Sequence, residues 1–255
     1  MIVNKIIPKI TLVGAGPGDL ELITLKGLKA IRQADVILFD ALVNEELLKE
    51  APNAHHIFVG KRKGFKAYSQ DEINKLIIDS AYLYGNVVRL KGGDSFVFGR
   101  GYEEIQYAEV FDIPCEVIPG ISSSISVPAL AGIPVTHRGV SNSFYVITGT
   151  LSDGSLNPEI NNAALSSGTV VVLMGLSKLE EITEVYKANG KSNQSIAVIS
   201  NGSLPNEKTV TGKISTIVKT VNDEGIKAPA IILIGDVVDL QKKYDIILKE
   251  VLENN

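Results

Sequence analysis

The sequence predicts an α/β protein made of two α/β domains with a ligand cleft between them. Short runs of β-branched residues alternate with amphipathic helical patterns, and this alternation is typical of largely parallel sheets covered by helices on both faces. A polar, glycine-containing stretch at 139–142 interrupts the pattern near its middle. We therefore expect one domain over residues 1–138 and a second over residues 139–255, with the ligand between them.

The first half of the chain carries five strand candidates and three helix candidates. The strands are short apolar runs bounded by turn residues, and the helices show apolar residues three and four positions apart. Ile73, Leu76 and Ile77, for example, fall on one face of a helical pattern whose other face is charged. In chain order we expect strand Ile10–Val13, helix Leu22–Gln33, strand Val36–Phe39, strand Ile57–Val59, helix Gln70–Leu83, strand Val87–Leu90, helix Tyr102–Phe111 and strand Glu116–Ile118.

The second half repeats the same alternation. Its pattern predicts strand Phe144–Thr148, strand Thr169–Met174, helix Ser177–Ala188, strand Ile196–Ile199, a weak strand pair around Thr209–Gly212, helix Ile214–Asn222 and strand Ala230–Ile234. The tail KKYDIILKEVLE (242–253) has the spacing of a terminal amphipathic helix, which we expect to serve packing.

Composition excludes several classes of protein. Lys and Arg number 25 against 29 Asp and Glu, so a net charge of −4 argues against a nucleic-acid partner. The single cysteine, Cys115, excludes a disulfide scaffold, and the three histidines with Cys115 lack zinc-ligand spacing, so we expect no metal. The N-terminus has no signal-peptide pattern and no apolar run approaches the roughly 20 residues of a membrane span. These features predict a cytoplasmic protein with no membrane partner.

A first glycine loop, VGAGPGD (13–19), follows a strand and precedes a helix. With Asp40 at the end of the next strand, it imitates the dinucleotide-binding fingerprint of Rossmann-type oxidoreductases. Pro17 argues against that interpretation because it removes an N–H group that would bind phosphate. Asp19 also places a negative charge at the start of the following helix, where a pyrophosphate needs positive potential. A plain glycine turn with Asp19 as N-cap remains an alternative.

A second glycine loop, RLKGGDSFVFGRG (89–101), follows another strand. Gly92 and Gly93 permit close approach of a ligand to the backbone, and Asp94 can cap a helix or accept hydrogen bonds from a sugar. Two strand–glycine–Asp loops in one chain favour a single nucleoside-like ligand that contacts both.

Several stretches together resemble the tetrapyrrole methylases, and within them the uroporphyrinogen-III C-methyltransferases. From about residue 10 to 239 they run in the family's order, over about nine tenths of the chain. The resemblance implies a class III methyltransferase fold, S-adenosyl-L-methionine in the cleft, and a homodimer. It also implies methylation of carbons 2 and 7 of uroporphyrinogen III. The product would be precorrin-2, an intermediate in the biosynthesis of sirohaem or cobalamin. The stretches are VGAGPGDLELITLKGLKAIRQADVILFDALV, VGKRKGFKAYSQDEIN, VVRLKGGDSFVFGRGYEE, VIPGISSSISVPALAGIPVTHRGVS, VVVLMGL and AVISNGS.

The same resemblance assigns roles to individual positions. Asp40 and Lys61 match the family's proton acceptor and donor, and Asp40 at a strand end is a reasonable base for the proton that a carbon acid must lose after methylation. Without the resemblance, Asp40 as a helix cap and Lys61 as a surface charge would be the simpler interpretations. The implied cofactor-binding residues are Pro17, Gly92, Gly93, Asp94, Val97, Ser122, Ser123, Met174, Gly202 and, more weakly, Pro229 and Ala230.

Arginine usage adds a hypothesis about the substrate. All five arginines precede residue 139, and arginine suits bidentate recognition of carboxylates, of which uroporphyrinogen carries eight. We expect Arg62, Arg100 and Arg138 to meet substrate acetate and propionate groups, together with Lys61.

Three departures from the family pattern leave alternatives open. Ser95 and Tyr102 replace a proline and a glycine, and Ser122–Ser123 replaces Thr-Ala. A methylase of a later precorrin or of another tetrapyrrole, a Rossmann-type oxidoreductase, and a regulator that binds S-adenosylmethionine without catalysis are the alternatives.

Overall fold

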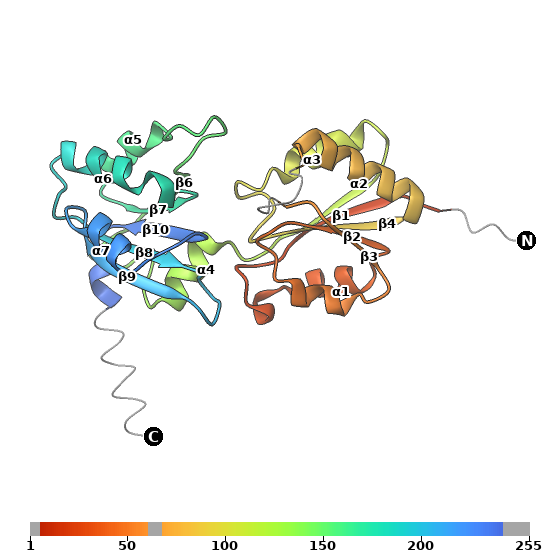
Figure 1. Cartoon of the computed structure of the whole chain (residues 1–255), viewed down its shortest axis with the longest axis horizontal. Coiled ribbons are helices and arrows are strands. Elements are labelled where there is room, and N and C mark those ends of the chain that lie inside the picture. The colour runs from red at the N-terminus through yellow and green to blue at the C-terminus, as the bar shows by residue number, and fades with distance from the viewer. Residues whose placement is uncertain (1–5, 61–67, 242–255) are drawn as a thin grey trace, which may run out of the picture. The chain divides into compact units, whose positions relative to one another are not determined.

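The protein divides into two compact units, Met1–Ser122 and Ser123–Asn255, in a computed structural model that describes residues 6–60 and 68–241 (Figure 1). The expected boundary after residue 138 falls inside the second unit. The reason is α4 (Ser123–Leu130), which packs against β7 (Thr169–Leu173) and β10 (Ala230–Ile234) of the second sheet.

The first unit contains an all-parallel sheet in the order β3-β2-β4-β1-β5. Parallel pairing places the carboxyl ends of all five strands at one edge, where the two glycine loops begin. The strands are β1 (Lys9–Gly14), β2 (Val36–Phe39), β3 (His55–Phe58), β4 (Asn86–Lys91) and β5 (Cys115–Ile118). The helices are α1 (Leu25–Arg32), α2 (Gln70–Tyr84) and α3 (Gly101–Glu109).

Side chains at alternate positions of these strands pack into two separate hydrophobic cores, one on each face of the sheet. Val36 and Leu38 of β2 pack in the cluster that contains α2 and α3, whereas Ile37 and Phe39 pack in the cluster that contains α1. Figure 1 shows α1 on the opposite side of the sheet from α2 and α3. The expectation of a parallel sheet covered on both faces is confirmed for this unit.

The second unit contains a mixed sheet in the order β6-β7-β10-β8-β9. β6 and β7 are parallel, but β10 runs antiparallel to both of its neighbours and β8 is antiparallel to β9, so the largely parallel sheet expected here is wrong. α5, α6 and α7 cover one face and α4 covers the other. The remaining bounds are β6 (Phe144–Thr148), β8 (Ser195–Ser200), β9 (Lys208–Lys213), α5 (Glu159–Leu165), α6 (Leu179–Ala188) and α7 (Ile217–Asp223).

Some elements differ from their predicted form. α1 begins at Leu25 rather than Leu22 because Thr24 accepts a hydrogen bond from the Gly27 N–H and caps it, and Leu20–Leu22 forms a separate 3₁₀ helix. The pattern did not predict α4, α5 or the 3₁₀ helix Glu45–Glu50. The predicted terminal helix 242–253 lies outside the described residues. Within residues 6–60 and 68–241, no helix is long and apolar enough to span a bilayer.

Candidate active site

Three loops meet at the carboxyl edge of the first sheet, after β1, β4 and β5. The N–H of Gly16 donates to the Gly93 carbonyl (3.1 Å) and the N–H of Gly93 donates to the Gly16 carbonyl (2.7 Å). A Cβ atom on Gly14 would lie 2.4 Å from the Gly120 nitrogen, and one on Gly120 would lie 2.2 Å from the Gly93 oxygen. We call Gly14, Gly93 and Gly120 the glycine junction, because here three backbones approach more closely than any Cβ allows.

Asp94 holds two of these loops together. Its Oδ1 accepts a hydrogen bond from the Phe96 N–H (2.8 Å), which closes a turn, and its Oδ2 accepts one from the Gly120 N–H (2.9 Å). Both carboxylate oxygens therefore already bind backbone, and Asp94 supports the glycine junction directly.

The first glycine loop lacks the features that bind a phosphate group. Asp19 accepts a hydrogen bond from the Glu21 N–H (2.9 Å), which bears out its expected capping role. Pro17 is half-buried in the turn and has no N–H to offer. In addition, β4 lies between β1 and β2, whereas the two strands are neighbours in the dinucleotide-binding order. The loop and the strand order both argue against the Rossmann alternative.

Asp40 lies directly after β2, at the same edge of the sheet. Its Oδ1 accepts a hydrogen bond from the Leu42 N–H (3.0 Å), and its Oδ2 is 3.8 Å from a terminal nitrogen of Arg89. The Asp40 side chain is 25% exposed, so one carboxylate oxygen forms a turn and the other faces a cation close to solvent. Its predicted partners Lys61 and Arg62 lie outside the described residues.

Arg89, Lys91 and Glu104 form a buried ionic cluster that was not predicted from the sequence. Glu104 of α3 accepts hydrogen bonds through Oε1 from Arg89 (3.1 Å) and Lys91 (3.0 Å) of β4, and all three residues are at most 5% exposed. Burial and the neighbouring Arg89 guanidinium lower the pKa of Lys91. The signal was present in the sequence: charges at alternate positions of VVRLK point the same way from a strand expected to be covered on both faces.

The segment between β4 and α3, together with the first turn of α3, exposes aromatic side chains and one arginine. Phe96, Phe98 and Tyr102 are 53%, 45% and 60% exposed, and Val97 between the phenylalanines is half-buried. Arg100 adopts a left-handed conformation (φ 58°) and binds Glu103 through two hydrogen bonds of 2.9 and 2.5 Å, which lowers the pKa of Glu103. This predicted substrate residue is therefore exposed, with its guanidinium held by a neighbour on the same helix.

The predicted cofactor residues of the second unit gather at one end of its sheet. Continued from the observed pairs, the register of β7 and β10 places Met174 opposite Ala230, and Ala230 pairs directly with Ser200 at the end of β8. A Cβ on Gly202 would lie 2.3 Å from Val127 of α4, so the loop after β8 lies on this helix. Met174 is left-handed (φ 52°) and 54% exposed.

The other predicted residues fall at the ends of this arrangement. Ser122 and Ser123 join the loop after β5 to the start of α4, and both are half-buried. Arg138 is exposed in the turn closed by the hydrogen bond from the His137 N–H to the Ser141 carbonyl (2.9 Å), and it belongs to the second unit rather than the first. The predicted residues therefore form two groups, one in each unit.

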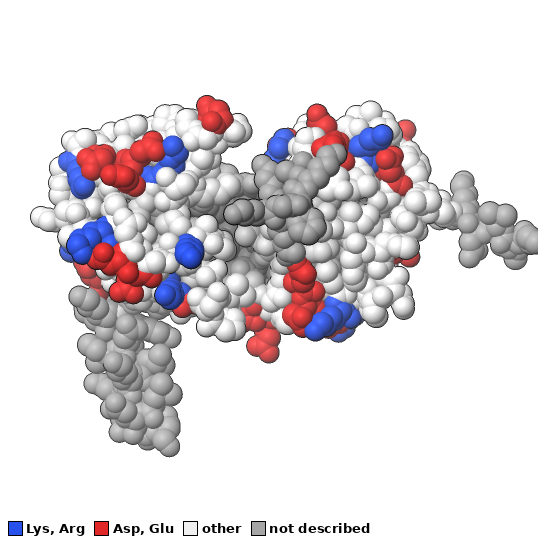
Figure 2. All heavy atoms as spheres, viewed as in Figure 1, with Lys and Arg blue, Asp and Glu red and all other residues white. Residues whose placement is uncertain are grey.

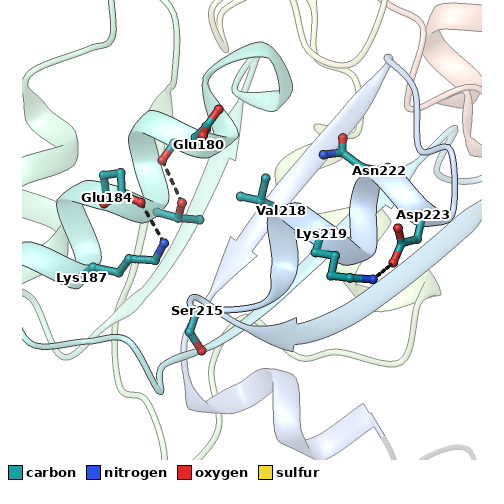
Figure 3. Close-up of a pocket in the computed structure, with 9 residues that line it drawn as sticks. Glu180, Glu184, Lys187, Ser215, Val218, Lys219, Asn222 and Asp223 are labelled. Carbon is teal, nitrogen blue, oxygen red and sulfur yellow. Dashed lines mark hydrogen bonds and ion pairs between the residues drawn. The ribbon is translucent and has the colours of Figure 1, made fainter.

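An open depression between α6 and α7 is separate from both groups (Figure 3). Four of its charged side chains are paired along their own helices, Lys187 with Glu184 (2.8 Å) and Lys219 with Asp223. Figure 2 likewise shows acidic and basic side chains beside one another on the face of each unit that it presents. Within the described ranges, no group of three or more His, Cys, Asp or Glu side chains could hold a metal ion.

Comparison with known proteins gives the family. The model of the tetrapyrrole (corrin/porphyrin) methylases matches residues 9–218. A uroporphyrinogen-III C-methyltransferase of Methanocaldococcus jannaschii is 46% identical over 91% of this chain and 97% of its own length. A siroheme synthase of Actinobacillus pleuropneumoniae is 44% identical over 94% of this chain but only 49% of its own length. Uroporphyrin-III C-methyltransferase of Thermus thermophilus, solved with S-adenosylhomocysteine, has 35% identity and a TM-score of 0.78 over 91% of this chain and 99% of its own. On the family match and the near-complete overlap with these relatives, the chain belongs to the tetrapyrrole methylase family.

Proposed function

We propose that this protein is an S-adenosyl-L-methionine-dependent uroporphyrinogen-III C-methyltransferase that methylates carbons 2 and 7 and yields precorrin-2. The observation that carries the proposal is the 46% identity to a relative of that name over 97% of the relative's length. The chain spans about half the length of a siroheme synthase that it matches, and the proposal concerns the methylation reaction.

The residues fit the cofactor. S-adenosylmethionine carries no phosphate, so it does not need the N–H group that Pro17 removes from the first glycine loop. Its positively charged sulfonium and ammonium groups suit a loop that offers carbonyl and carboxylate oxygens. The glycine junction fixes the loops that carry the proposed cofactor residues of the first unit, and Met174 of the second unit is exposed. The residues proposed to hold the cofactor are Pro17, Gly92, Gly93, Asp94, Val97, Ser122, Ser123, Met174, Gly202 and Ala230.

When bound, S-adenosylmethionine supplies a methyl group that is already activated on a sulfonium. The protein's main contribution is then to orient the pyrrole carbon toward that methyl. Methylation of a fully substituted pyrrole carbon leaves that ring cationic, so a proton must leave from another atom of the tetrapyrrole, and we assign its removal to the Asp40 carboxylate at the strand end. Lys61 is the proposed proton donor, and Arg62, Arg100 and Arg138 are the proposed contacts of the substrate carboxylates.

We further propose that the protein is cytoplasmic, that it forms a homodimer, and that its partner is a small-molecule tetrapyrrole. The family resemblance supports the dimer, and sedimentation of the purified chain tests it. A sedimenting mass of one chain at the concentration used for turnover would overturn the dimer while leaving the activity proposal intact.

The activity is tested by anaerobic incubation with enzymatically generated uroporphyrinogen III and S-adenosylmethionine, followed by mass spectrometry of the tetrapyrrole. Gain of two methyl groups is expected from the wild-type protein. Asp40→Asn is expected to reduce turnover while binding S-adenosylhomocysteine as the wild type does. Binding of S-adenosylhomocysteine without any methyl gain would refute this substrate and favour a later precorrin or a non-catalytic regulator.

A further inference from the structure

Four charged side chains lie on one face of the first sheet at its carboxyl edge. Arg89 and Lys91 are two residues apart on β4, so their side chains leave the strand on the same face. Glu104 of α3 meets both from above that face, and Asp40 continues from β2, the strand next to β4. Only Asp40 of these four reaches solvent, with 25% of its side chain exposed against 6% or less for the others.

Arg89 connects Asp40 to the buried part of this cluster. One of its terminal nitrogens lies 3.8 Å from Asp40 Oδ2, and the other donates hydrogen bonds to the carbonyls of Leu38 (3.3 Å) and Leu90 (3.0 Å). Its Nε donates to Glu104 Oε1. A single planar guanidinium thus hydrogen-bonds the backbone two residues before Asp40 and the backbone of its own strand, and its charge faces the Asp40 carboxylate at 3.8 Å.

The cluster is costly to keep, which argues for a role beyond folding. Glu104 Oε1 also accepts a hydrogen bond from Gln70 (3.3 Å), whereas Oε2 has no hydrogen-bond partner among the described residues. Burial and Arg89 lower the pKa of Lys91, so the interior disfavours its charge. Buried ion pairs are often no more stable than the apolar side chains that could replace them. Two buried cations against one buried anion also leave Asp40 as the nearest compensating charge.

We propose that Arg89, held by Glu104, is a positioning residue that orients the Asp40 carboxylate for proton removal. The inference rests on the proposed function, because it needs Asp40 to act in the methyl-transfer reaction. Arg89 itself stays buried and does not contact the substrate. Its effect on turnover therefore passes through Asp40.

The test is a double-mutant cycle on kcat, with Arg89→Met and Asp40→Asn as the single variants and the wild type as reference. Arg89→Met removes the guanidinium and is expected to lower kcat by up to about 100-fold, the loss that a displacement of about 1 Å at a reacting group can cause. KM for uroporphyrinogen III and the Kd for S-adenosylhomocysteine are expected to stay within about twofold of wild type, because neither ligand contacts Arg89. In the Asp40→Asn background, Arg89→Met is expected to cause almost no further loss.

A conservative variant allows the test to be completed even if Arg89→Met does not fold. Arg89→Lys keeps a cation facing Asp40 and Glu104 but cannot reach both carbonyls, so its loss in kcat is expected to be smaller and again absent in Asp40→Asn. Circular dichroism and S-adenosylhomocysteine binding check that each variant is folded. If Arg89→Met fails these checks, Arg89→Lys alone completes the cycle.

The outcomes separate the two proposals. Losses that multiply, so that Arg89→Met or Arg89→Lys reduces kcat equally with and without Asp40, would refute the positioning role and leave the activity standing. Wild-type turnover in Asp40→Asn would also refute it. Absence of turnover by the wild-type protein would instead refute the proposed function, and this inference with it.

Discussion

Gly120→Ala is the substitution for which the structure gives the clearest steric expectation. A Cβ at this position would lie 2.2 Å from the Gly93 oxygen and 2.6 Å from two backbone atoms of Gly14, whereas ordinary contact begins at 3.4 Å. Every one of these atoms belongs to backbone, so no side-chain rotation can relieve the clash. The shift also endangers the hydrogen bond from the Gly120 N–H to Asp94.

The expected loss follows from these distances. Overpacking costs about 1–3 kcal/mol, and the absence of a flexible neighbour places this site at the upper end, about 3 kcal/mol. With a urea m-value of about 3 kcal/mol/M, the midpoint of the first unit should fall by about 1 M. Because the sequence has no tryptophan, the unfolding is followed by circular dichroism. Affinity for S-adenosylhomocysteine should fall in parallel, since the glycine junction underlies the proposed cofactor site.

Gly139→Ala is the matched control for this substitution. Gly139 has φ +82°, and a Cβ added there would have no atom within 4 Å, so alanine meets a conformational penalty of about 1 kcal/mol and no clash. Because Gly139 lies in the second unit, this control should leave the midpoint of the first unit unchanged. A Gly120→Ala protein with the same first-unit midpoint as Gly139→Ala, and with unchanged S-adenosylhomocysteine affinity, would refute the close approach of the three loops.

Three further substitutions test individual contacts by urea unfolding. Ser95→Ala should raise the unfolding free energy by up to about 1 kcal/mol, because the fully buried hydroxyl has no partner among the described residues; a loss of stability would show that it is bonded. Ser69→Ala should lower it by about 1 kcal/mol, because Ser69 and Glu72 form the capping box of α2; no change would mean that this helix end depends on packing alone. Glu116→Gln should flatten the pH dependence of stability in acid. Hydrogen bonds from Lys26 and Lys9 lower the pKa of Glu116 from 4.5 to about 2, so its small, exposed contribution is full above 4.5 and is lost as pH falls toward 2; an unchanged slope would contradict this pairing.

Strand positions could be predicted from the sequence because each strand is a short apolar run with defined ends. The run Val36–Phe39 matches β2 residue for residue, and Phe144–Thr148 matches β6. The direction of pairing in the second sheet could not be predicted in this way. β10 is as apolar as a parallel strand because both of its faces are covered, although it runs antiparallel to its neighbours.

The helices show a similar division. α2 combines a capping box with apolar residues at helical spacing, and its predicted and observed ends agree within one residue. α4 (SSISVPAL) offers neither signal, because its apolar residues surround the helix and Pro128 lies inside it. Its position is fixed by packing against β7 and β10, a tertiary effect that no local pattern records. The same packing moves the division between the units back to Ser122–Ser123.

In the candidate site, too, the features that a local sequence pattern shows could be predicted, and those that depend on long-range contacts could not. Glycines at strand ends are visible in the sequence, because a close backbone approach requires them wherever the partner lies. The role of Asp94 was not visible, since its second oxygen binds the Gly120 N–H 26 residues later. The Arg89–Glu104 contact likewise joins a strand to the helix after it, and only the fold shows which carboxylate the charges of VVRLK meet. The Asp94–Gly120 bond joins two of the glycine loops, and the Arg89–Glu104 contact lies beside Asp40. The parts of the site that a sequence motif omits are therefore those that hold the motif in place.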